Sequence, residues 1–143
     1  MSILVIIGSA IVVFLGLAHA AATLASTPSG GPMTPTSPEV REAMQHTGGL
    51  GLAPELRTTL YRAWTGFNLS HSVGVIGIGL VVLVPAARDF DAALGDPWWV
   101  SLALIAPPVY LLLSIRYWFS SPTRAISVAS ACILVGIGVG LAA

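Results

Sequence analysis

The sequence predicts an all-α integral membrane protein, in which four spanning helices form a bundle and a short interfacial helix lies in the first loop. Composition is the first observation. Of the 143 residues, 55% are hydrophobic and only 8% are charged, whereas soluble domains carry about 25% charged residues. The second observation is a mean hydropathy of +0.87, concentrated in four apolar stretches long enough to cross a bilayer. The third is the chain length, which allows one membrane domain over residues 1–143.

The first span is expected over residues 3–24, an almost continuous apolar stretch of sufficient length to cross a bilayer. The competing interpretation is a cleaved signal peptide, because Ala18-His19-Ala20 is similar to an A-x-A cleavage site. No Lys or Arg precedes the apolar run, and the run continues beyond that site. Both observations favour a retained transmembrane helix.

A Pro-rich loop and a short helix are expected over residues 26–53. Thr36 or Ser37 can cap the helix, Pro38 suits its first turn, and Glu39 occupies the position that a capping box requires. About ten residues are too few to span a bilayer, so we expect this helix to lie at the interface or to fold over the bundle as a lid. Its apolar side consists of Val40, Ala43 and Met44, and Gly48-Gly49 is expected to end it.

The second long helix is expected to start at Pro54-Glu55, and its apolar part covers residues 64–84. Pro85 and the Arg88-Asp89-Phe90-Asp91 cluster should end it, because proline disrupts a helix interior and charge is costly in lipid. A hinge should follow before the third helix.

The third span is expected over residues 98–119, with Asp96 as its N-cap and Pro97 in its first turn. Pro107-Pro108 should kink it, because two backbone N–H donors are missing there. Trp98 and Trp99 fit an aromatic belt at this membrane face.

The fourth span is expected over residues 123–141, capped by Ser121-Pro122. Small residues spaced along it predict close contact with a neighbouring helix. They are Ala125, Ala129, Gly136 and Gly140.

Polar residues interrupt the start of the second apolar stretch, where a plain membrane anchor would carry Leu and Val. At helical spacing Trp64, Asn68 and His71 share one stripe. Polar groups in lipid are costly unless they are paired within a bundle, so this stripe is the candidate functional site. A neighbouring stripe of Gly66, Ser70 and Gly74 predicts packing against a second backbone.

Arginine distribution predicts the topology. Five arginines flank the loops on one side of the four spans, and Arg88 alone lies on the other. By the positive-inside rule the long first loop is cytoplasmic, both termini are outside, and the protein is multi-pass in the cell (inner) membrane. The five are Arg41, Arg57, Arg62, Arg116 and Arg124.

With this topology, further polar residues fall in the same half of the bilayer as His71 and could line one cavity. They are the candidate ligand-binding residues His19, Trp64, Tyr110, Ser114, Arg116 and Tyr117, with Glu42 and His46 of the short helix in reach as a lid.

Several function classes are excluded or disfavoured. Net charge is zero and Lys is absent, so there is no basic patch for nucleic acid. Cys132 is the only cysteine, which excludes paired-thiol chemistry. No expected span contains Asp or Glu, and the histidine spacing does not match a metal-binding motif, so no metal site is assigned. The cofactor is unknown, although two histidines on different helices could ligate a haem.

The interpretation that best fits the residues is a pocket for membrane lipid or another lipophilic small molecule, with a few polar groups that orient it. If the protein converts this ligand, His71 is the acid–base candidate and Asn68 would polarise a substrate oxygen. The competing class is a non-enzymatic accessory subunit, or a homo-oligomer, that packs through Gly-rich helix faces.

The run Gly66-Phe67-Asn68-Leu69-Ser70-His71-Ser72, with the Arg116-Tyr117-Trp118-Phe119 segment, resembles a family of small, functionally uncharacterised bacterial four-helix membrane proteins. The resemblance covers most of the chain except the Pro-rich loop. It implies a bacterial membrane protein and carries no established activity, so it assigns no catalytic residue.

Overall fold

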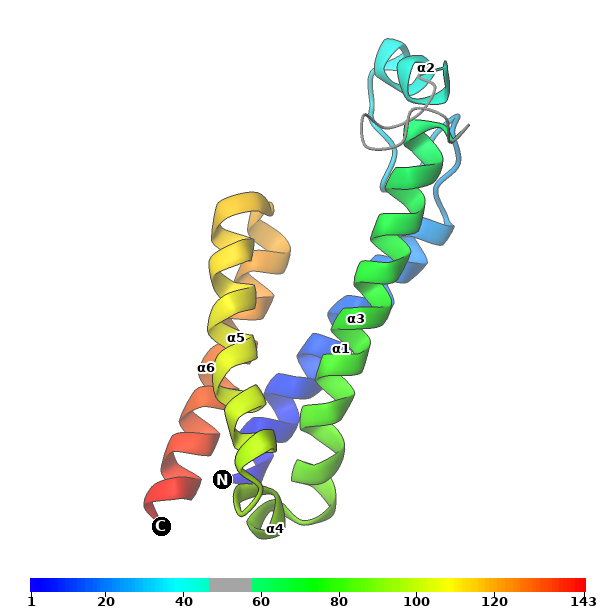
Figure 1. Cartoon of the computed structure of the whole chain (residues 1–143). Coiled ribbons are helices and arrows are strands. Elements are labelled where there is room, and N and C mark those ends of the chain that lie inside the picture. Colours follow the sequence, from blue (N-terminus) through cyan, green and yellow to red (C-terminus); the bar gives the residue numbers. More distant parts are fainter. Residues whose placement is uncertain (47–57) are drawn as a thin grey trace. The chain divides into compact units, whose positions relative to one another are not determined.

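The computed structural model describes residues 1–46 and 58–143, and within these residues the chain is helical with no β-strand. Helices account for almost all regular structure; one isolated β-bridge joins Thr27 and Gly30. The elements in chain order (Figure 1) are α1 Ser2–Leu24, α2 Pro38–His46, α3 Leu60–Arg88, α4 Phe90–Leu94, α5 Pro97–Tyr117 and α6 Ser120–Ala142.

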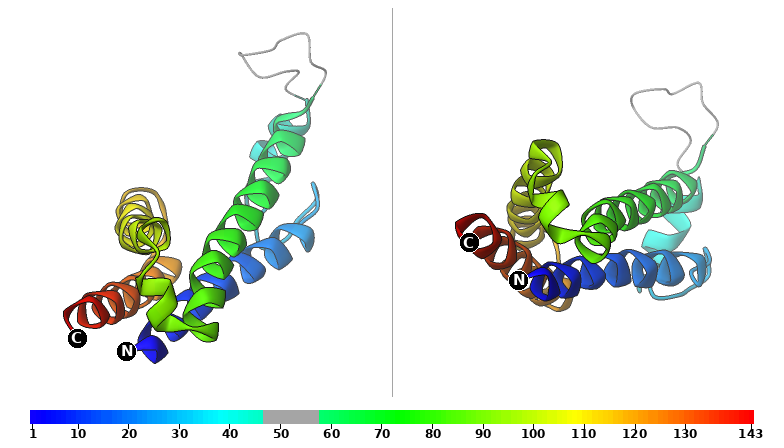
Figure 2. Two further views of the ribbon diagram at one scale, coloured as in Figure 1. Left: turned by 60° about the horizontal axis from the view of Figure 1, so that its bottom comes forward. Right: turned by 90° about the horizontal axis from the view of Figure 1, so that it is seen from below.

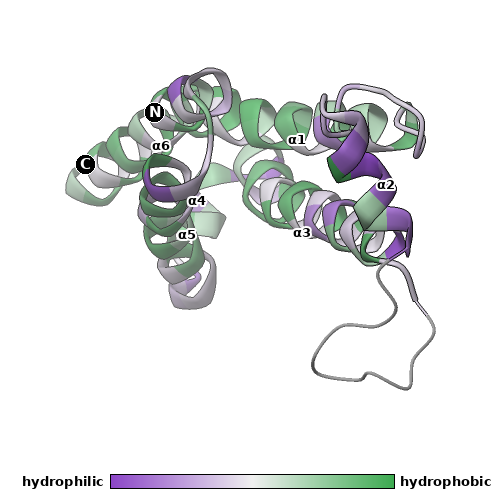
Figure 3. Ribbon diagram, turned by 90° about the horizontal axis from the view of Figure 1, so that it is seen from above, coloured by the Kyte–Doolittle hydropathy of each residue, from purple (hydrophilic) through white to green (hydrophobic). Residues whose placement is uncertain are grey.

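Four of the described helices, α1, α3, α5 and α6, are long and apolar enough to cross a membrane. The shortest, α5, has 21 residues, which at 1.5 Å per residue gives about 31 Å, close to the ~30 Å hydrocarbon core of a bilayer. Hydrophobic residues dominate all four, whereas α2 is largely hydrophilic (Figure 3). For the described residues the all-α prediction is therefore confirmed, and the four long apolar helices fit a multi-pass membrane protein, while the bundle arrangement and the interfacial position of α2 stay predictions.

The chain forms two compact units. Unit 1 contains Met1–Leu15 and Val75–Ala143, and unit 2 contains Gly16–Gly74. The helices α1 and α3 each contribute one part to unit 1 and the other part to unit 2.

Helix contacts in unit 1 depend on glycines. A methyl group added at Gly8 of α1 would lie 2.6 Å from the Ala129 carbonyl oxygen of α6, and one added at Gly136 of α6 would lie 2.6 Å from Val5. A methyl group at Gly79 of α3 would likewise lie 2.7 Å from Val13 of α1. These backbones approach more closely than any side chain would allow, as small residues permit in membrane helices.

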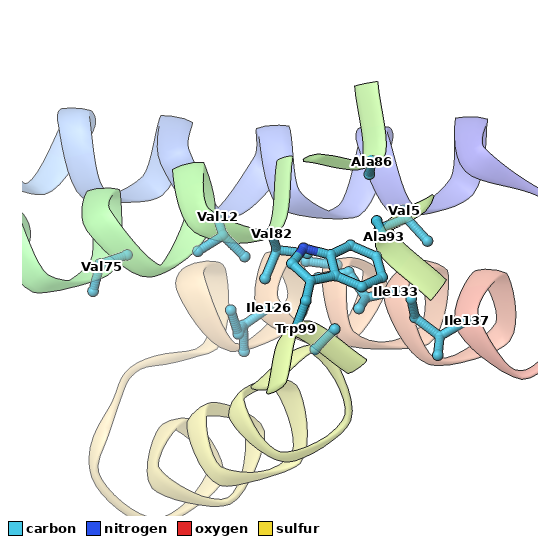
Figure 4. Packing of buried hydrophobic residues seen from close by; sticks show 12 residues of the cluster. Val5, Val12, Val75, Val82, Ala86, Ala93, Trp99, Ile126, Ile133 and Ile137 are labelled. Carbon is cyan, nitrogen blue, oxygen red and sulfur yellow. The ribbon is translucent and has the colours of Figure 1, made fainter. Parts of the chain in front are cut away.

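The close contact predicted for the last helix is confirmed at Gly136 and Gly140, the latter against Phe90 and Leu94 of α4. The apolar core of unit 1 surrounds these contacts with buried side chains from α1, α3, α4, α5 and α6 (Figure 4). It includes Val5, Val12, Val82, Ala93, Trp99, Ile126, Ala129, Ile133 and Ile137.

The structure corrects several predicted helix ends. α3 continues through Pro85 but ends at Arg88, where the charged cluster was expected to end it, and the short helix α4 replaces the expected hinge. The Asp96 cap of α5 is confirmed, because its carboxylate accepts from the backbone N–H groups of Trp98 and Trp99. The Ser121-Pro122 cap is wrong: α6 begins at Ser120, with Phe119 at the N-cap and no side-chain capping bond.

The two tryptophans expected in an aromatic belt differ in exposure. Trp98 is 85% exposed, as expected of an interface residue, but Trp99 is 5% exposed and belongs to the core. The Trp99 indole N–H donates to the Val81 carbonyl oxygen at 3.1 Å, and Phe90 packs edge-on against its ring. This hydrogen bond allows a ring with a polar N–H to lie inside the unit.

The prolines at 107 and 108 lie inside α5, which continues across them. Without their N–H donors, the carbonyls one turn earlier lose their usual intrahelical partners. Ser130 of α6 donates to the Pro107 carbonyl oxygen at 3.2 Å, so a hydrogen bond joins α6 to α5 at the proline pair.

Unit 2 begins its loop with a turn that requires glycine. Gly31 has a φ of +141°, and a methyl group there would lie 2.6 Å from the Ser26 Cα atom. The Ser26 hydroxyl accepts from the Met33 N–H at 2.8 Å, and Thr34 is buried with its hydroxyl donating to the Thr27 carbonyl oxygen. The Pro-rich segment is thus folded through side-chain hydrogen bonds to its own backbone.

The short helix α2 is present and Ser37 caps it, accepting from the Val40 N–H at 3.3 Å. The Ser37 hydroxyl also donates to the Glu39 carboxylate at 2.5 Å, and this bond lowers the pKa of Glu39 below its usual value of 4.5. Val40 is exposed and Met44 is buried. The predicted signals at Gly48-Gly49, Pro54-Glu55 and Arg57 lie outside the described residues. The predicted start of the second long helix at Pro54-Glu55 is wrong, because Thr58 and Thr59 are not helical and α3 begins at Leu60.

Candidate functional site: a histidine–asparagine–histidine cluster

The predicted polar stripe of α3 meets the end of α1 within unit 2. His19 of α1 contacts both Asn68 and His71 of α3. Asn68 is 5% exposed and each histidine is partly buried. The structure therefore brings together three of the polar residues that the sequence singled out, from helices that are otherwise apolar here.

Helical geometry explains why these side chains converge. Asn68 and His71 are three residues apart, so they lie on one face of α3. Neighbouring polar side chains are satisfied within their own helices and do not compete for the cluster. Thr23 donates to the His19 carbonyl oxygen and Ser72 donates to the Asn68 carbonyl oxygen, each at 2.8 Å.

The hydrogen bonds of Asn68 fix the protonated nitrogen of His19. The Asn68 Nδ2 group donates to the Trp64 carbonyl oxygen at 2.8 Å, and a carbonyl can only accept. The Asn68 Oδ1 atom therefore faces His19 Nε2, at 2.9 Å. Because Oδ1 is an acceptor, His19 Nε2 must carry hydrogen, which leaves Nδ1 of the neutral ring as an acceptor.

His71 adds a second imidazole beside the first. Its ring centroid lies 5.6 Å from that of His19 with an interplanar angle of 80°, an edge-on arrangement. On the same helix, Phe67 stacks on His71 at 6.3 Å with an angle of 9°. Phe67 is 67% exposed, so the cluster is bordered on this side by an accessible aromatic ring.

Trp64 connects the site to the folded loop. Its indole N–H donates to the Met33 carbonyl oxygen at 3.1 Å, while its own carbonyl oxygen accepts from Asn68. The first turns of α3 thus hold the Pro-rich segment on one side and orient the asparagine on the other. This makes Trp64 a positioning residue for the cluster in addition to a candidate ligand contact.

The comparisons with known proteins assign no function to the chain. No family model, no curated protein and no solved structure matches it. The resemblance of the run at residues 66–72 to a bacterial family therefore stays a prediction, and the site must be interpreted from its own chemistry.

The other predicted site residues belong to unit 1. Tyr110 is partly buried and packs edge-on against Trp118. With Ser9 and Ser130 it lines a small cavity of about 20 Å³, enough volume for a single water molecule. The remaining lining of this cavity is mostly apolar, so it resembles a packing defect more than a ligand pocket.

The last turn of α5 holds the remaining three candidates. Ser114 is fully buried and donates to the Leu111 carbonyl oxygen at 2.8 Å. Arg116 and Tyr117 are exposed, Tyr117 to 75%. Ser114 is therefore occupied in holding the helix end, and the other two are accessible at the end of a spanning helix.

A metal or haem at this cluster finds limited support. In residues 1–46 and 58–143 no group of three or more His, Cys, Asp or Glu side chains is arranged to hold a metal ion. For a haem, His19 would have to ligate through Nδ1, because its Nε2 bonds Asn68. Two neighbouring imidazoles alone are therefore a weak argument for either group.

Sequence reasoning missed two contributors to the site. Phe67 was passed over as an ordinary apolar residue, although its spacing of four from His71 signals a shared helix face. Met33 could not have been found, because its role is a backbone carbonyl bonded to a side chain 31 positions away.

Proposed function

We propose that this multi-pass membrane protein binds a lipophilic small molecule at the cluster of His19, Asn68 and His71. The observation that carries the proposal is the convergence of two imidazoles and a buried amide from two apolar helices. Polar groups at such depth in lipid are expensive, and a ligand with its own polar group is the economical reason to place three together.

The hydrogen-bond inventory indicates which ligand group would fit. With Nε2 donating to Asn68, the Nδ1 atom of neutral His19 is an acceptor that receives no hydrogen bond from the described residues. A ligand hydroxyl or amine N–H could donate to it. The exposed Phe67 ring beside His71 offers a flat apolar surface for the body of the ligand.

Helix association alone accounts poorly for the cluster. A polar bond between membrane helices contributes on average about 0.6 kcal/mol and at most about 1.7 kcal/mol. The hydrogen bond between His19 and Asn68 already links the two helices. This link does not require the second histidine, His71. If the ligand is also converted, His71 is the acid–base group, because imidazole exchanges a proton near neutral pH.

The proposal is tested by extracting the detergent-purified full chain and identifying small molecules that co-purify by mass spectrometry. Wild type should retain a lipophilic compound. In His71→Ala and Asn68→Ala the amount of co-purified compound should fall at least about tenfold, because each variant removes one hydrogen bond to a partly charged group. Ser70→Ala is the matched control, because Ser70 is exposed on α3 and bonds only the Phe67 carbonyl oxygen.

Insertion and helical content should be equal in all variants, checked by circular dichroism. Retention of the compound by both cluster variants at the wild-type level would refute the pocket. Equal loss in the Ser70 variant would show that the effect is not specific to the cluster.

One observation favours a second candidate, an accessory subunit of a larger membrane complex. Methyl groups added at Gly66, Gly74 or Gly77 of α3 would meet no atom within 4 Å, so the predicted glycine packing is not used by the part of the chain that the structure describes. An unused glycine face suits a helix of another chain. A native pull-down that recovers only this chain would count against that candidate.

A further inference from the structure

We infer a second binding site in unit 1, at the connection between α3 and α5, that takes the head group of an amine-bearing zwitterionic phospholipid. The connection contains a hollow of about 280 Å³, roughly nine water molecules at ~30 Å³ each. Its charged lining residues are Arg88, Asp89 and Asp96, and Trp99 lies at its apolar side. The proposal is independent of the histidine cluster, which belongs to unit 2.

The two carboxylates are held by helix capping. Asp89 is the N-cap of α4 and accepts from the Ala92 N–H at 3.0 Å. Asp96 is the N-cap of α5 and accepts from the Trp98 N–H at 2.9 Å. In both, the capping atom is Oδ1, and the Oδ2 atoms form no hydrogen bond within residues 1–46 and 58–143. Each aspartate is thus fixed in position and keeps one carboxylate oxygen for a ligand.

Arg88 supplies the opposite charge. It is the last residue of α3 and is exposed, and among the described residues its guanidinium makes neither a hydrogen bond nor an ion pair. A basic residue at a helix C-terminus interacts favourably with the helix dipole, but this leaves its five N–H donors unused. Those donors match a phosphate group in a paired geometry.

The wall of the hollow is rigid. The Trp99 ring is buried, its N–H is bonded to the Val81 carbonyl oxygen, and Phe90 packs against it. Trp99 therefore closes the apolar side of the hollow, and the carboxylates of Asp89 and Asp96 are the groups that attract a cation. The hollow combines one anion-binding group with two groups that favour an ammonium.

The position of the hollow indicates that its ligand is a lipid head group. α3 and α5 are spanning helices, so the segment that joins them lies at a membrane surface, and Trp98 beside it is 85% exposed, as interface tryptophans are. A phosphate linked to a primary ammonium is the head group of phosphatidylethanolamine. Its ammonium has three N–H donors for the two carboxylates, whereas phosphatidylcholine has none and phosphatidylglycerol has no cation.

The test is native mass spectrometry of the full chain with phosphatidylethanolamine, phosphatidylcholine and phosphatidylglycerol of identical acyl chains. We expect phosphatidylethanolamine to be retained best. Asp89→Asn and Asp96→Asn should each reduce its binding by up to about fivefold, the upper range for an exposed ion pair, and Arg88→Gln should reduce it similarly.

Two features of this experiment distinguish a loss of lipid binding from a loss of folding. Asparagine caps a helix as well as aspartate does, so the substitutions remove charge and keep α4 and α5. Asp91→Asn is the matched control, because Asp91 is an exposed acid of α4 that does not line the hollow. This variant should bind phosphatidylethanolamine as well as wild type does.

Three results would overturn the inference. One is equal retention of phosphatidylethanolamine and phosphatidylcholine by wild type. Another is preferred retention of phosphatidylglycerol that depends on Arg88 but not on the aspartates. The third is displacement of the lipid by soluble phosphoethanolamine at matching concentration, which would identify a soluble ligand of the same head-group chemistry as the occupant.

Discussion

At the scale of single residues, Asn68 determines the chemical state of the candidate site. It accepts from His19 and donates to the Trp64 carbonyl oxygen, so one amide sets the tautomer of an imidazole on another helix. The two polar contacts of Asn68 could not both be read from the sequence. Spacing placed Asn68 and His71 on one face, but the partner on α1 depends on the rotation of that helix, which apolar residues on all sides leave unspecified.

The tautomer of His19 gives a test at this scale. In wild type, ¹⁵N chemical shifts of labelled protein in detergent at pH 8 should show hydrogen on Nε2 of His19, because Asn68 Oδ1 requires a donor. Asn68→Asp preserves the acceptor and should preserve the tautomer, whereas Asn68→Leu should allow both tautomers. A wild-type His19 with hydrogen on Nδ1 would contradict the geometry.

At the scale of elements, the four spanning helices follow from apolar length alone, and the sequence placed each within a few residues. The Asp96 cap was also predictable, because a cap is a local feature of two or three residues. The burial of Trp99 was not, since adjacent tryptophans at a helix start both suit an interface and only the position of α4 decides which one turns inward.

Glycines separate into two classes that the sequence could not distinguish. Gly66 and Gly74 were expected to pack but meet no neighbour, whereas Gly136 and Gly140 pack closely as expected and Gly8 and Gly79 do so without having been predicted. A small residue makes a close approach possible, but the presence of a neighbour depends on which face of the helix meets another element.

This distinction predicts opposite effects on stability. Gly8→Ala should lower the free energy of unfolding by about 1–3 kcal/mol, because the new methyl group would overlap the Ala129 carbonyl oxygen, a backbone atom that cannot rotate away. Gly66→Ala is the matched control. It meets no atom and should raise stability by about 0.5–1 kcal/mol through helix propensity.

Thermal unfolding in detergent measures both substitutions. A destabilised Gly66→Ala variant would indicate that another chain covers this face, which would support the accessory-subunit candidate. An unchanged Gly8→Ala variant would contradict the helix contact.

At the scale of the whole molecule, the orientation in the membrane is the main open prediction. Four of the described helices are long and apolar enough to cross a membrane, and four crossings would place both termini on one side. Arginine counting places the termini outside and the long first loop in the cytoplasm. A reporter that is active only outside the cytoplasm, fused after Ala143, should be active, and a fusion within the loop near Thr27 should be inactive. Activity in the opposite pattern would overturn this orientation.

The contact between the first and last spanning helices has a consequence for the order of assembly. α5 ends at Tyr117 and α6 begins at Ser120, and Thr123 donates to the Ser114 carbonyl oxygen, so these helices can pair as a hairpin as soon as both are synthesised. α1 emerges first, yet its Gly8 packs on Ala129, near the end of the chain. Loop closure over most of the chain must come before that contact. During biogenesis the close-packed face of α1 therefore stays in lipid, or in contact with insertion machinery, until the final helix arrives.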